Sequence, residues 1–356
     1  MTPAPARFLL APGAYTDAAW FAREQQRVFT HTWHVVAHVE QLSNPGDFVT
    51  VTIGGAPVAI VRHDDGTLRA FHNLCRHRGM TLLEGDGDTG SEIECMYHGW
   101  RYDLDGALRV VPQRRAQFPD LDPASCSLIP ASVDVWEGMV FANPDPDAMP
   151  LDEALGALPD HIGSHRPGHL ALVGAADVRA ACNWKLLVEN HIDVYHLWYL
   201  HRESLGDFDH NQLEHHQIGR NWASYEPLRS TDVDAARLTA GTVALRELDD
   251  RDRNGLGAHL VFPNTLMASN AEFFMSYAVV PEGPDRSHVE IRIRAEPDAD
   301  GLSLVGAARS FIEEDVHACE RIQTALSSPW FAVGPLARTH EAPITTFQQN
   351  LLDLLA

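Results

Sequence analysis

The two stretches Cys75-Arg76-His77 and Cys95-Met96-Tyr97-His98 decide the fold of the N-terminal part of the chain. Each places a thiol and an imidazole on one tight loop, and seventeen residues separate His77 from Cys95. Such a set can hold one zinc ion or, with two ligands on each iron, a [2Fe–2S] cluster. Zinc sites of this composition pair Cys with Cys and His with His, whereas two Cys-His half-sites are typical of a cluster. The spacing therefore favours a cluster held by Cys75, His77, Cys95 and His98.

Short β-branched and aromatic runs surround these two loops and are separated by the turn signals Asn-Pro-Gly, Gly-Gly and Asp-Asp-Gly. Strands are expected at 34–39, 48–53, 57–62, 67–71, 92–95 and 133–141. The stretch 143–147, Asn-Pro-Asp-Pro-Asp, is typical of a linker. We therefore expect a small antiparallel β domain over residues 33–147.

The remainder of the chain mixes both kinds of secondary structure. Helical patterns are expected at 16–29, 183–200 and 304–326, and strands at 259–262, 273–280 and 289–294. This predicts an α+β fold, with a second domain over 148–356.

Composition excludes several classes of function. The chain has 356 residues and a net charge of −22, which repels phosphate backbones and argues against nucleic-acid binding. No apolar run approaches the roughly 20 residues that cross a bilayer, so we expect a soluble, cytoplasmic protein without membrane contact. The five cysteines are an odd number and widely scattered, which favours reduced thiols or metal ligands over disulfides.

A second group of candidate metal ligands lies on the expected helix 183–200. Asp193, His196 and His201 fall within nine positions, with Asn190 three residues before Asp193. Helical geometry places Asp193 on the apolar stripe. On a straight helix His201 would be about 140° from His196, so both can bind one ion only if the helix ends or bends between them.

The expected helix 304–326 carries one inward-facing carboxylate, that of Asp315. Its stripe comprises Leu304, Ala308, Phe311, Asp315, Cys319, Ile322 and Leu326, whereas Glu313, Glu314, Glu320 and Arg321 point elsewhere. A buried carboxylate needs a partner or a metal. Pairing with a buried Arg or His is one interpretation. The other is that two histidines and Asp315 form the facial triad of non-haem Fe(II) oxygenases.

Together these residues resemble the Rieske non-haem iron oxygenases, specifically their terminal oxygenase α subunit. The resemblance covers nearly the whole chain in order: Cys75-x-His77, Cys95-x-x-His98-Gly-Trp, Asn183-Trp-Lys, Glu189-Asn190-x-x-Asp193-x-Tyr195-His196-x4-His201, and Glu314-Asp315. It implies a Rieske [2Fe–2S] domain and a helix-grip, START-like catalytic domain with an antiparallel sheet and a long C-terminal helix, on which residues 1–32 pack.

The resemblance also implies an activity and partners. His196, His201 and Asp315 would hold a mononuclear Fe(II), with dioxygen as co-substrate. A ferredoxin or flavin reductase would supply electrons, so NAD(P)H would act only indirectly. A head-to-tail homotrimer is implied, in which His98 of one subunit meets Asp193 of the next. Asp193, which would hydrogen-bond His196, and Asn190 are the catalytic candidates.

The reaction expected is hydroxylation of a small organic substrate, including oxidative N- or O-demethylation. Cis-dihydroxylation of an aromatic ring is an alternative, and an electron carrier without oxygenase activity or a zinc-stabilised binding module are alternatives from other classes. The run 315–323 resembles the branch that oxidises quaternary ammonium compounds, although that branch usually carries Glu where this chain has Asp193. Two further sets are candidates: Phe208, Trp222, Phe273, Phe274 and Tyr277 for the pocket lining, and Arg76, Arg78 and Arg101 for docking of the electron donor.

Overall fold

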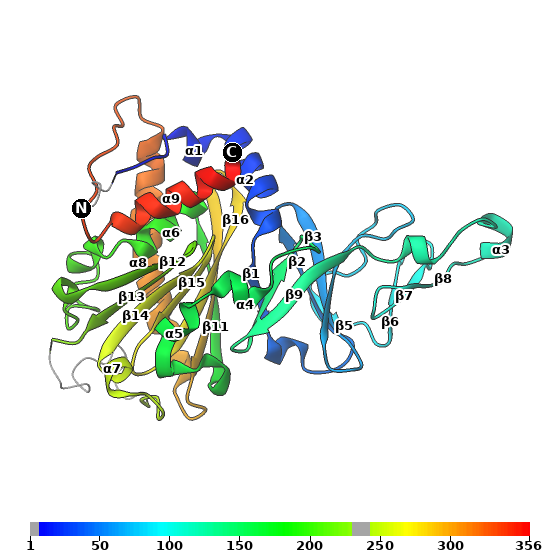
Figure 1. Cartoon of the computed structure of the whole chain (residues 1–356), viewed down its shortest axis with the longest axis horizontal. Helices are drawn as coiled ribbons and strands as arrows, with labels where there is room; N and C mark the ends of the chain where they lie inside the picture. The colour runs from blue at the N-terminus through cyan, green and yellow to red at the C-terminus, as the bar shows by residue number, and fades with distance from the viewer. Residues whose placement is uncertain (1–6, 230–242) are drawn as a thin grey trace. The chain divides into compact units, whose positions relative to one another are not determined.

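The chain divides into two units, one of residues Gln25–Leu151 and one that joins Met1–Glu24 to Asp152–Ala356. The computed structural model describes residues 7–229 and 243–356 (Figure 1). The first unit begins eight residues before the expected bound, at 25 against 33, and ends four residues after it, at 151 against 147. Part of the expected N-terminal segment, residues 1–6, lies outside the described ranges.

A seven-stranded antiparallel sheet forms the frame of the first unit, in the order β1-β10-β9-β4-β3-β2-β5. Its strands are β1 (His34–His38), β2 (Asp47–Ile53), β3 (Ala56–Arg62), β4 (Leu68–His72), β5 (Asp86–Asp88), β9 (Pro130–Trp136) and β10 (Met139–Asn143). The single strand expected at 133–141 is wrong. Glu137 and Gly138 have positive φ and turn the chain back, so β9 and β10 are a hairpin.

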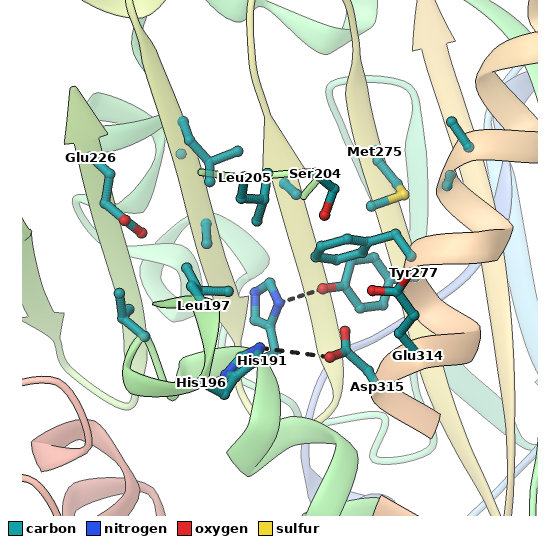
Figure 2. Close-up of a pocket in the computed structure, with 18 of the residues that line it drawn as sticks. His191, His196, Leu197, Ser204, Leu205, Glu226, Met275, Tyr277, Glu314 and Asp315 are labelled. Carbon is teal, nitrogen blue, oxygen red and sulfur yellow. Dashed lines mark hydrogen bonds and ion pairs between the residues drawn. The ribbon is translucent and has the colours of Figure 1, made fainter. Parts of the chain in front are cut away.

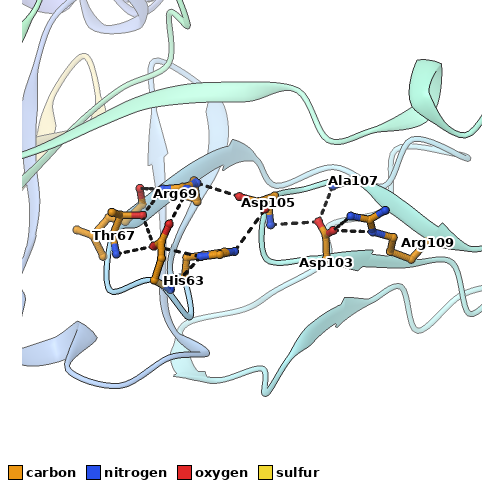
Figure 3. A network of polar contacts seen from close by, with 9 residues as sticks. His63, Thr67, Arg69, Asp103, Asp105, Ala107 and Arg109 are labelled. Carbon is orange, nitrogen blue, oxygen red and sulfur yellow. Dashed lines mark hydrogen bonds and ion pairs between the residues drawn. The ribbon is translucent and has the colours of Figure 1, made fainter.

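A separate three-stranded sheet carries the cluster loops: β6 (Glu92–Glu94), β7 (Arg101–Asp103) and β8 (Leu108–Val110). The turn between β7 and β8 is tied to the large sheet through Arg69 of β4, whose Nε donates to Asp105 Oδ1 at 3.1 Å (Figure 3). At this turn a Cβ on Gly106 would lie 2.6 Å from the ring of Phe71. Close backbone packing and this ion pair together fix the small sheet beside β4.

The second unit is built on another seven-stranded antiparallel sheet, in the order β11-β17-β16-β15-β14-β13-β12. The strands are β11 (Ala171–Ala180), β12 (Glu214–Ile218), β13 (Asn221–Pro227), β14 (Gly255–Val261), β15 (Thr265–Ser269), β16 (Phe274–Gly283) and β17 (Arg286–Ala295). Strands β14, β16 and β17 overlap the three that the sequence predicts, although the expected strands 259–262 and 273–280 each extend one residue beyond the observed one. The antiparallel sheets with long helices confirm the expected α+β class.

Three main helices accompany this sheet: α6 (Trp184–Ile192), α8 (Gly301–Leu326) and α9 (Ala342–Leu355). Helix α8 packs on β11 and β17, whereas α6 contacts α8, α9, β14 and β16 (Figure 1). The expected helix 16–29 is instead two, α1 (Gly13–Thr16) and α2 (Ala18–Arg27), because Asp17 accepts the amides of Ala19 and Trp20 and caps α2. Shorter helices are α3 (Arg114–Gln117), α4 (Leu151–Leu155), α5 (Leu158–Ile162) and α7 (Asp250–Arg253).

The only lysine of the chain, Lys185, is fully buried and anchors α6. Its Nζ lies 2.6 Å from Oε1 of Glu24, which is equally buried, and Trp184 Nε1 donates to the other Glu24 oxygen at 3.0 Å. Burial lowers the pKa of Lys185 while Glu24 opposes that shift. Within the described ranges no helix is both long and apolar enough to cross a membrane.

Candidate metal sites and active-site cavity

The two Cys-His loops are conformational copies of each other. Each cysteine carbonyl accepts the amide of the glycine four residues on, Gly79 at 2.8 Å and Gly99 at 2.9 Å. Both glycines have positive φ, 71° and 67°, which L side chains rarely adopt. The amides of Cys75 and Cys95 likewise each donate to the carbonyl five residues on. The sequence therefore folds into two matched turns that present their side chains to one another.

The two cysteines of these loops are more deeply buried than the two histidines, as expected for a Rieske cluster. Cys75 and Cys95 are buried, whereas His77 is half-buried and His98 is exposed, and the two histidine Nδ1 atoms lie 3.1 Å apart. Burial raises the pKa of the Cys95 thiol, so thiolates here need a positive charge beside them. Burial and His98 lower the pKa of His77 and favour the neutral imidazole that can bind a metal. The residues fit a cluster with an inner thiolate iron and an outer histidine iron.

Tyr102 is a neighbour of this site that the sequence did not identify. Its hydroxyl accepts the amide of Arg76 at 3.0 Å and lies 3.4 Å from Cys75 Sγ. Because its oxygen already accepts the amide, the hydroxyl hydrogen is free to point at the sulfur. Trp100 stacks on His77 with ring centroids 5.0 Å apart.

A second convergence of ligand atoms lies in the other unit. Nε2 of His201 is 2.8 Å from Asp315 Oδ1, and Nε2 of His196 is 3.6 Å from the same oxygen. In the described ranges this is the one group of three or more His, Cys, Asp or Glu side chains whose donor atoms lie within 4.8 Å of one another. No three of Cys75, His77, Cys95 and His98 meet this criterion in the described ranges, whereas the ligands of a single zinc ion would.

Each imidazole of this group has a carboxylate on its Nδ1 side, opposite the Nε2 atom that faces Asp315. Asp193 Oδ2 lies 3.5 Å from His196 Nδ1, an ion-pair contact too long for a good hydrogen bond, and Glu314 Oε2 lies 3.0 Å from His201 Nδ1. Burial alone would lower the pKa of His196, but Asp193 and Asp315 outweigh it and raise the pKa. An imidazole oriented in this way presents Nε2 to a metal. When an ion takes the place of the hydrogen on Nε2, two imidazoles and a carboxylate fit a divalent iron.

The helix ends where the predicted metal site needs it to end. Helix α6 stops at Ile192 and Asp193 is its C-cap, so His196 lies on a 3-10 turn (Tyr195–Trp198) and His201 on the following turn. The helix expected to 200 is wrong, because it ends before both histidines; between His196 and His201 it is the 3-10 turn that ends, at Trp198. Asp193 is half-buried beyond the helix and not on its inward stripe.

Next to His196 and Asp315 lies a cavity of about 260 Å³ (Figure 2). One wall comes from alternate residues of the sheet: Leu256 and Ala258 on β14, Ala268 on β15, and Met275 and Tyr277 on β16. The other walls come from α8 and the segment 194–205. The cavity exists because the lining residues on β14, β15 and α8 include several with small side chains. Most of the lining is apolar. Such a cavity suits a small organic molecule.

Tyr277 and His191 form a polar pair in this cavity. Nε2 of His191 lies 3.0 Å from the carbonyl oxygen of His259, which can only accept, so Nδ1 carries no hydrogen when the ring is neutral. Burial lowers the pKa of His191 to about 4, which keeps it neutral. The Tyr277 hydroxyl therefore donates to Nδ1, and its oxygen is left to accept hydrogen bonds from a ligand.

Some of the other predicted site residues line the cavity and some do not. Of the proposed lining aromatics, Phe273 and Tyr277 line the cavity, while Phe208, Trp222 and Phe274 are buried elsewhere in the core. Asn190 is half-buried on α6, outside the cavity lining.

Helix α8 needs two corrections. The sequence predicted that Glu314 points away from the site and Ile322 inward. Glu314 instead contacts His201, whereas Ile322 is 46% exposed and Gln323 takes its place in the core. Phe311 is half-buried and stacks on His201 at 4.0 Å.

The three arginines near the cluster loops differ in their partners. Arg101 is paired with Glu92 at 2.7 Å, and Arg78 lies over the ring of Tyr97, whereas Arg76 is exposed. Arg76 and Arg78 thus remain the stronger candidates for contact with an electron donor.

Comparison with known families adds an independent observation. The model of the ring-hydroxylating alpha subunit catalytic domain matches residues 168–356, and that of the Rieske [2Fe-2S] domain matches residues 32–130. This chain belongs to the ring-hydroxylating alpha subunit family. The two matches fall on the two units and contain the two sets of candidate metal ligands. The resemblance inferred from the motifs is thereby confirmed.

Relatives of this ring-hydroxylating alpha subunit include both dioxygenases and monooxygenases. It is 38% identical over 192 residues to the biphenyl 2,3-dioxygenase alpha subunit of Rhodococcus jostii, covering 52% of this chain and 42% of that one. It is 35% identical over 244 residues to the carnitine monooxygenase oxygenase subunit of Escherichia coli, covering 67% and 63%. The glycine betaine monooxygenase oxygenase subunit of Chromohalobacter salexigens is 25% identical over 372 residues, covering 94% and 82%. The chain thus spans less than two thirds of the first two relatives.

Solved structures share the fold of this alpha subunit. The quaternary ammonium Rieske monooxygenase CntA in complex with L-carnitine superposes with a TM-score of 0.82 at 23% identity, covering 99% of this chain and 96% of that one. Naphthalene 1,2-dioxygenase from Rhodococcus sp. gives a TM-score of 0.77 at 21% identity, covering 97% and 94%.

Proposed function

We propose that this alpha subunit is the terminal oxygenase of a Rieske oxygenase system and hydroxylates a small organic substrate with dioxygen and externally supplied electrons. The observation that carries the proposal is the convergence of His196, His201 and Asp315 at the wall of a largely apolar cavity. An electron carrier has no use for such a cavity and triad. A zinc-stabilised binding module would not need the second set of ligands.

The ligand assignment follows from the two sets of side chains. Cys75, His77, Cys95 and His98 would hold the [2Fe–2S] cluster, and His196, His201 and Asp315 a mononuclear Fe(II). These groups supply single electrons and the redox activation of dioxygen. Overall, one substrate C–H bond, dioxygen, two electrons and two protons give one C–OH group and water.

The chain's own residues bind, orient and exclude water. Glu314 holds the His201 ring by a hydrogen bond, and Asp193 attracts the His196 ring at ion-pair distance, so that Nε2 of each faces Asp315. The apolar lining removes bulk water from around the substrate and strengthens every electrostatic contact inside. Ala258 and Ala268 leave room for substrate against the sheet.

The polar groups of the cavity favour a substrate that donates hydrogen bonds or carries positive charge. Glu226, Glu314 and Asp315 line it, and no Lys or Arg does so within the described ranges. A methylated amine or ammonium fits such a lining, and hydroxylation of its methyl group would release formaldehyde. The names of two relatives, carnitine monooxygenase and glycine betaine monooxygenase, agree with this choice.

Cis-dihydroxylation of an arene is the second candidate. The rings of Phe273 and Phe311 in the lining suit an aromatic substrate, and a relative at 38% identity is a biphenyl dioxygenase alpha subunit. A panel of N-methyl, O-methyl and arene substrates, supplied with a ferredoxin and reductase, separates the two. Formaldehyde released in proportion to the dioxygen consumed supports demethylation, and a cis-diol product supports the alternative. Dioxygen uptake that no substrate stimulates would contradict both.

Electron transfer between subunits belongs to the same proposal. A homotrimer would bring His98 of one subunit to Asp193 of the next, and Asp193 contacts His196. The exposure of His98, with Met96 82% exposed beside it, leaves this loop available for such a contact. Asp193→Ala should keep the iron content and the cluster spectrum yet lose turnover. Full turnover in this variant would contradict the bridge.

A further inference from the structure

A buried carboxylate lies in the cavity wall away from the predicted metal ligands. Glu226 on β13 is 2% exposed and lines the cavity, and Figure 2 shows it across the cavity from Asp315. Three strands, β14, β15 and β16, separate β13 from β17, on which α8 packs. Glu226 is therefore not placed to bind the same ion as His196, His201 and Asp315.

One oxygen of this carboxylate is held and the other is not. Oε2 of Glu226 contacts Nδ1 of His210, which is fully buried, and Oε1 receives no hydrogen bond from the described residues. His210 is itself fixed, because its carbonyl lies 2.9 Å from Nε2 of His340 and the ring of Trp198 lies edge-on at 5.9 Å. The carboxylate is thus oriented before any ligand arrives.

A carboxylate oxygen that faces a largely apolar cavity and receives no hydrogen bond from the protein is favourable only when a ligand or solvent offers it positive charge or a donor. Neither Lys nor Arg lines the cavity in the described ranges, so the chain does not supply a permanent cation there. Glu314 differs, since its Oε2 is used by His201 and its side chain is 47% exposed. Glu226 is thus a buried acidic group of the cavity, separate from the predicted metal site, that its protein partners leave half satisfied.

We propose that Glu226, oriented by His210, is the specificity-determining residue that selects a substrate with a cationic nitrogen. This rests on the proposed function, which it deepens by assigning a residue to recognition of the charge. The positive nitrogen faces Glu226, and a methyl group on the same nitrogen points toward Asp315 as the carbon to be oxidised. Phe273 and Met275, which also line the cavity, contact the apolar part. Glu226 is a binding residue and does not contact the reacting carbon.

The test compares a cation with a neutral molecule of the same shape. Choline and 3,3-dimethylbutan-1-ol are titrated calorimetrically into the iron-loaded protein without dioxygen. The wild type should bind choline more tightly. Glu226→Gln keeps an acceptor for His210 and should weaken choline binding at least about tenfold, because the coulombic attraction between the carboxylate and the cation is lost, and it should leave binding of the alcohol unchanged. Glu214→Gln, which removes the same charge from an exposed position on β12, is the control.

Two results would overturn the inference: equal weakening of both ligands in Glu226→Gln, or a wild type that does not prefer choline. The wild-type comparison needs no variant, so the inference stays testable if Glu226→Gln fails to fold. Binding is measured without turnover, so it is independent of the proposed function. If the protein prefers choline through Glu226 but oxidises no substrate, this inference holds and the proposed oxygenase function is contradicted.

Discussion

Glu314 lies 3.0 Å from Nδ1 of His201, on the side of the ring away from Asp315. Since a carboxylate only accepts, Nδ1 carries a hydrogen toward Glu314. His201 is thus fixed in an orientation in which a metal ion between Nε2 and Asp315 would take the place of the Nε2 hydrogen.

Glu314→Gln should weaken Fe(II) binding roughly 10- to 100-fold, as is usual when the hydrogen-bond partner of a metal-binding histidine is changed, because the amide still accepts from Nδ1 but no longer carries the charge that makes the ring a stronger ligand. Competition with a chelator measures the affinity, and the visible spectrum of the cluster should not change. Glu313→Gln is the matched control, because that side chain is exposed and pairs with Arg309. Equal affinities in the two variants would argue that Glu314 does not orient His201.

Tyr102→Phe should lower the reduction potential of the cluster. The hydroxyl close to Cys75 Sγ stabilises negative charge on the sulfur, which grows on reduction. Loss of a hydrogen bond of about 1 kcal/mol corresponds to roughly 40 mV for one electron. Tyr97→Phe is the control, since that exposed hydroxyl contacts Arg78 and not a sulfur. Redox titration that gives the wild-type potential for Tyr102→Phe would refute this role.

Glu189 should make the free energy of unfolding depend on pH. Burial raises its pKa from 4.5 to about 7, although Gln348 and Tyr15 donate to it. The folded state holds this proton more tightly, so its stabilisation is complete below about pH 4.5 and is lost as pH rises toward 7. Glu189→Gln should therefore be more stable than the wild type above pH 7, by about 3 kcal/mol.

Urea unfolding between pH 4.5 and 8 checks this expectation. The two proteins should be similar in stability near pH 4.5 and diverge as pH rises, whereas Glu153→Gln, at an exposed position on α4, should follow the wild type throughout. Parallel curves for Glu189→Gln and the wild type would show that Glu189 is ionised in the folded protein at all these pH values.

The candidate metal ligands could be picked out from the sequence because their chemistry is local. Cys75, His77, Cys95 and His98 fall on two short turns whose glycines the sequence displays, and Asp315 is the acidic residue on an apolar helical stripe. The structure brings each set together. No long-range information was needed to propose them.

Residues whose role depends on tertiary contacts could not be predicted. Glu314 lies beside the inward stripe, and only the position of His201 shows that it faces the site. Glu226 sits on a strand that the sequence did not indicate. Trp222 looked like a lining aromatic, but the alternation that would have placed it in the core requires the register of β13 with β14. Ile322 is exposed because the buried face of α8 runs through Gln323.

Iron content per chain tests the central claim most directly, namely that one chain carries both a cluster and a mononuclear iron. Elemental analysis of the protein reconstituted without dioxygen should give about three irons per chain, and Asp315→Ala about two with an unchanged cluster spectrum. Two irons per chain in the wild type, or zinc in place of iron, would contradict the account.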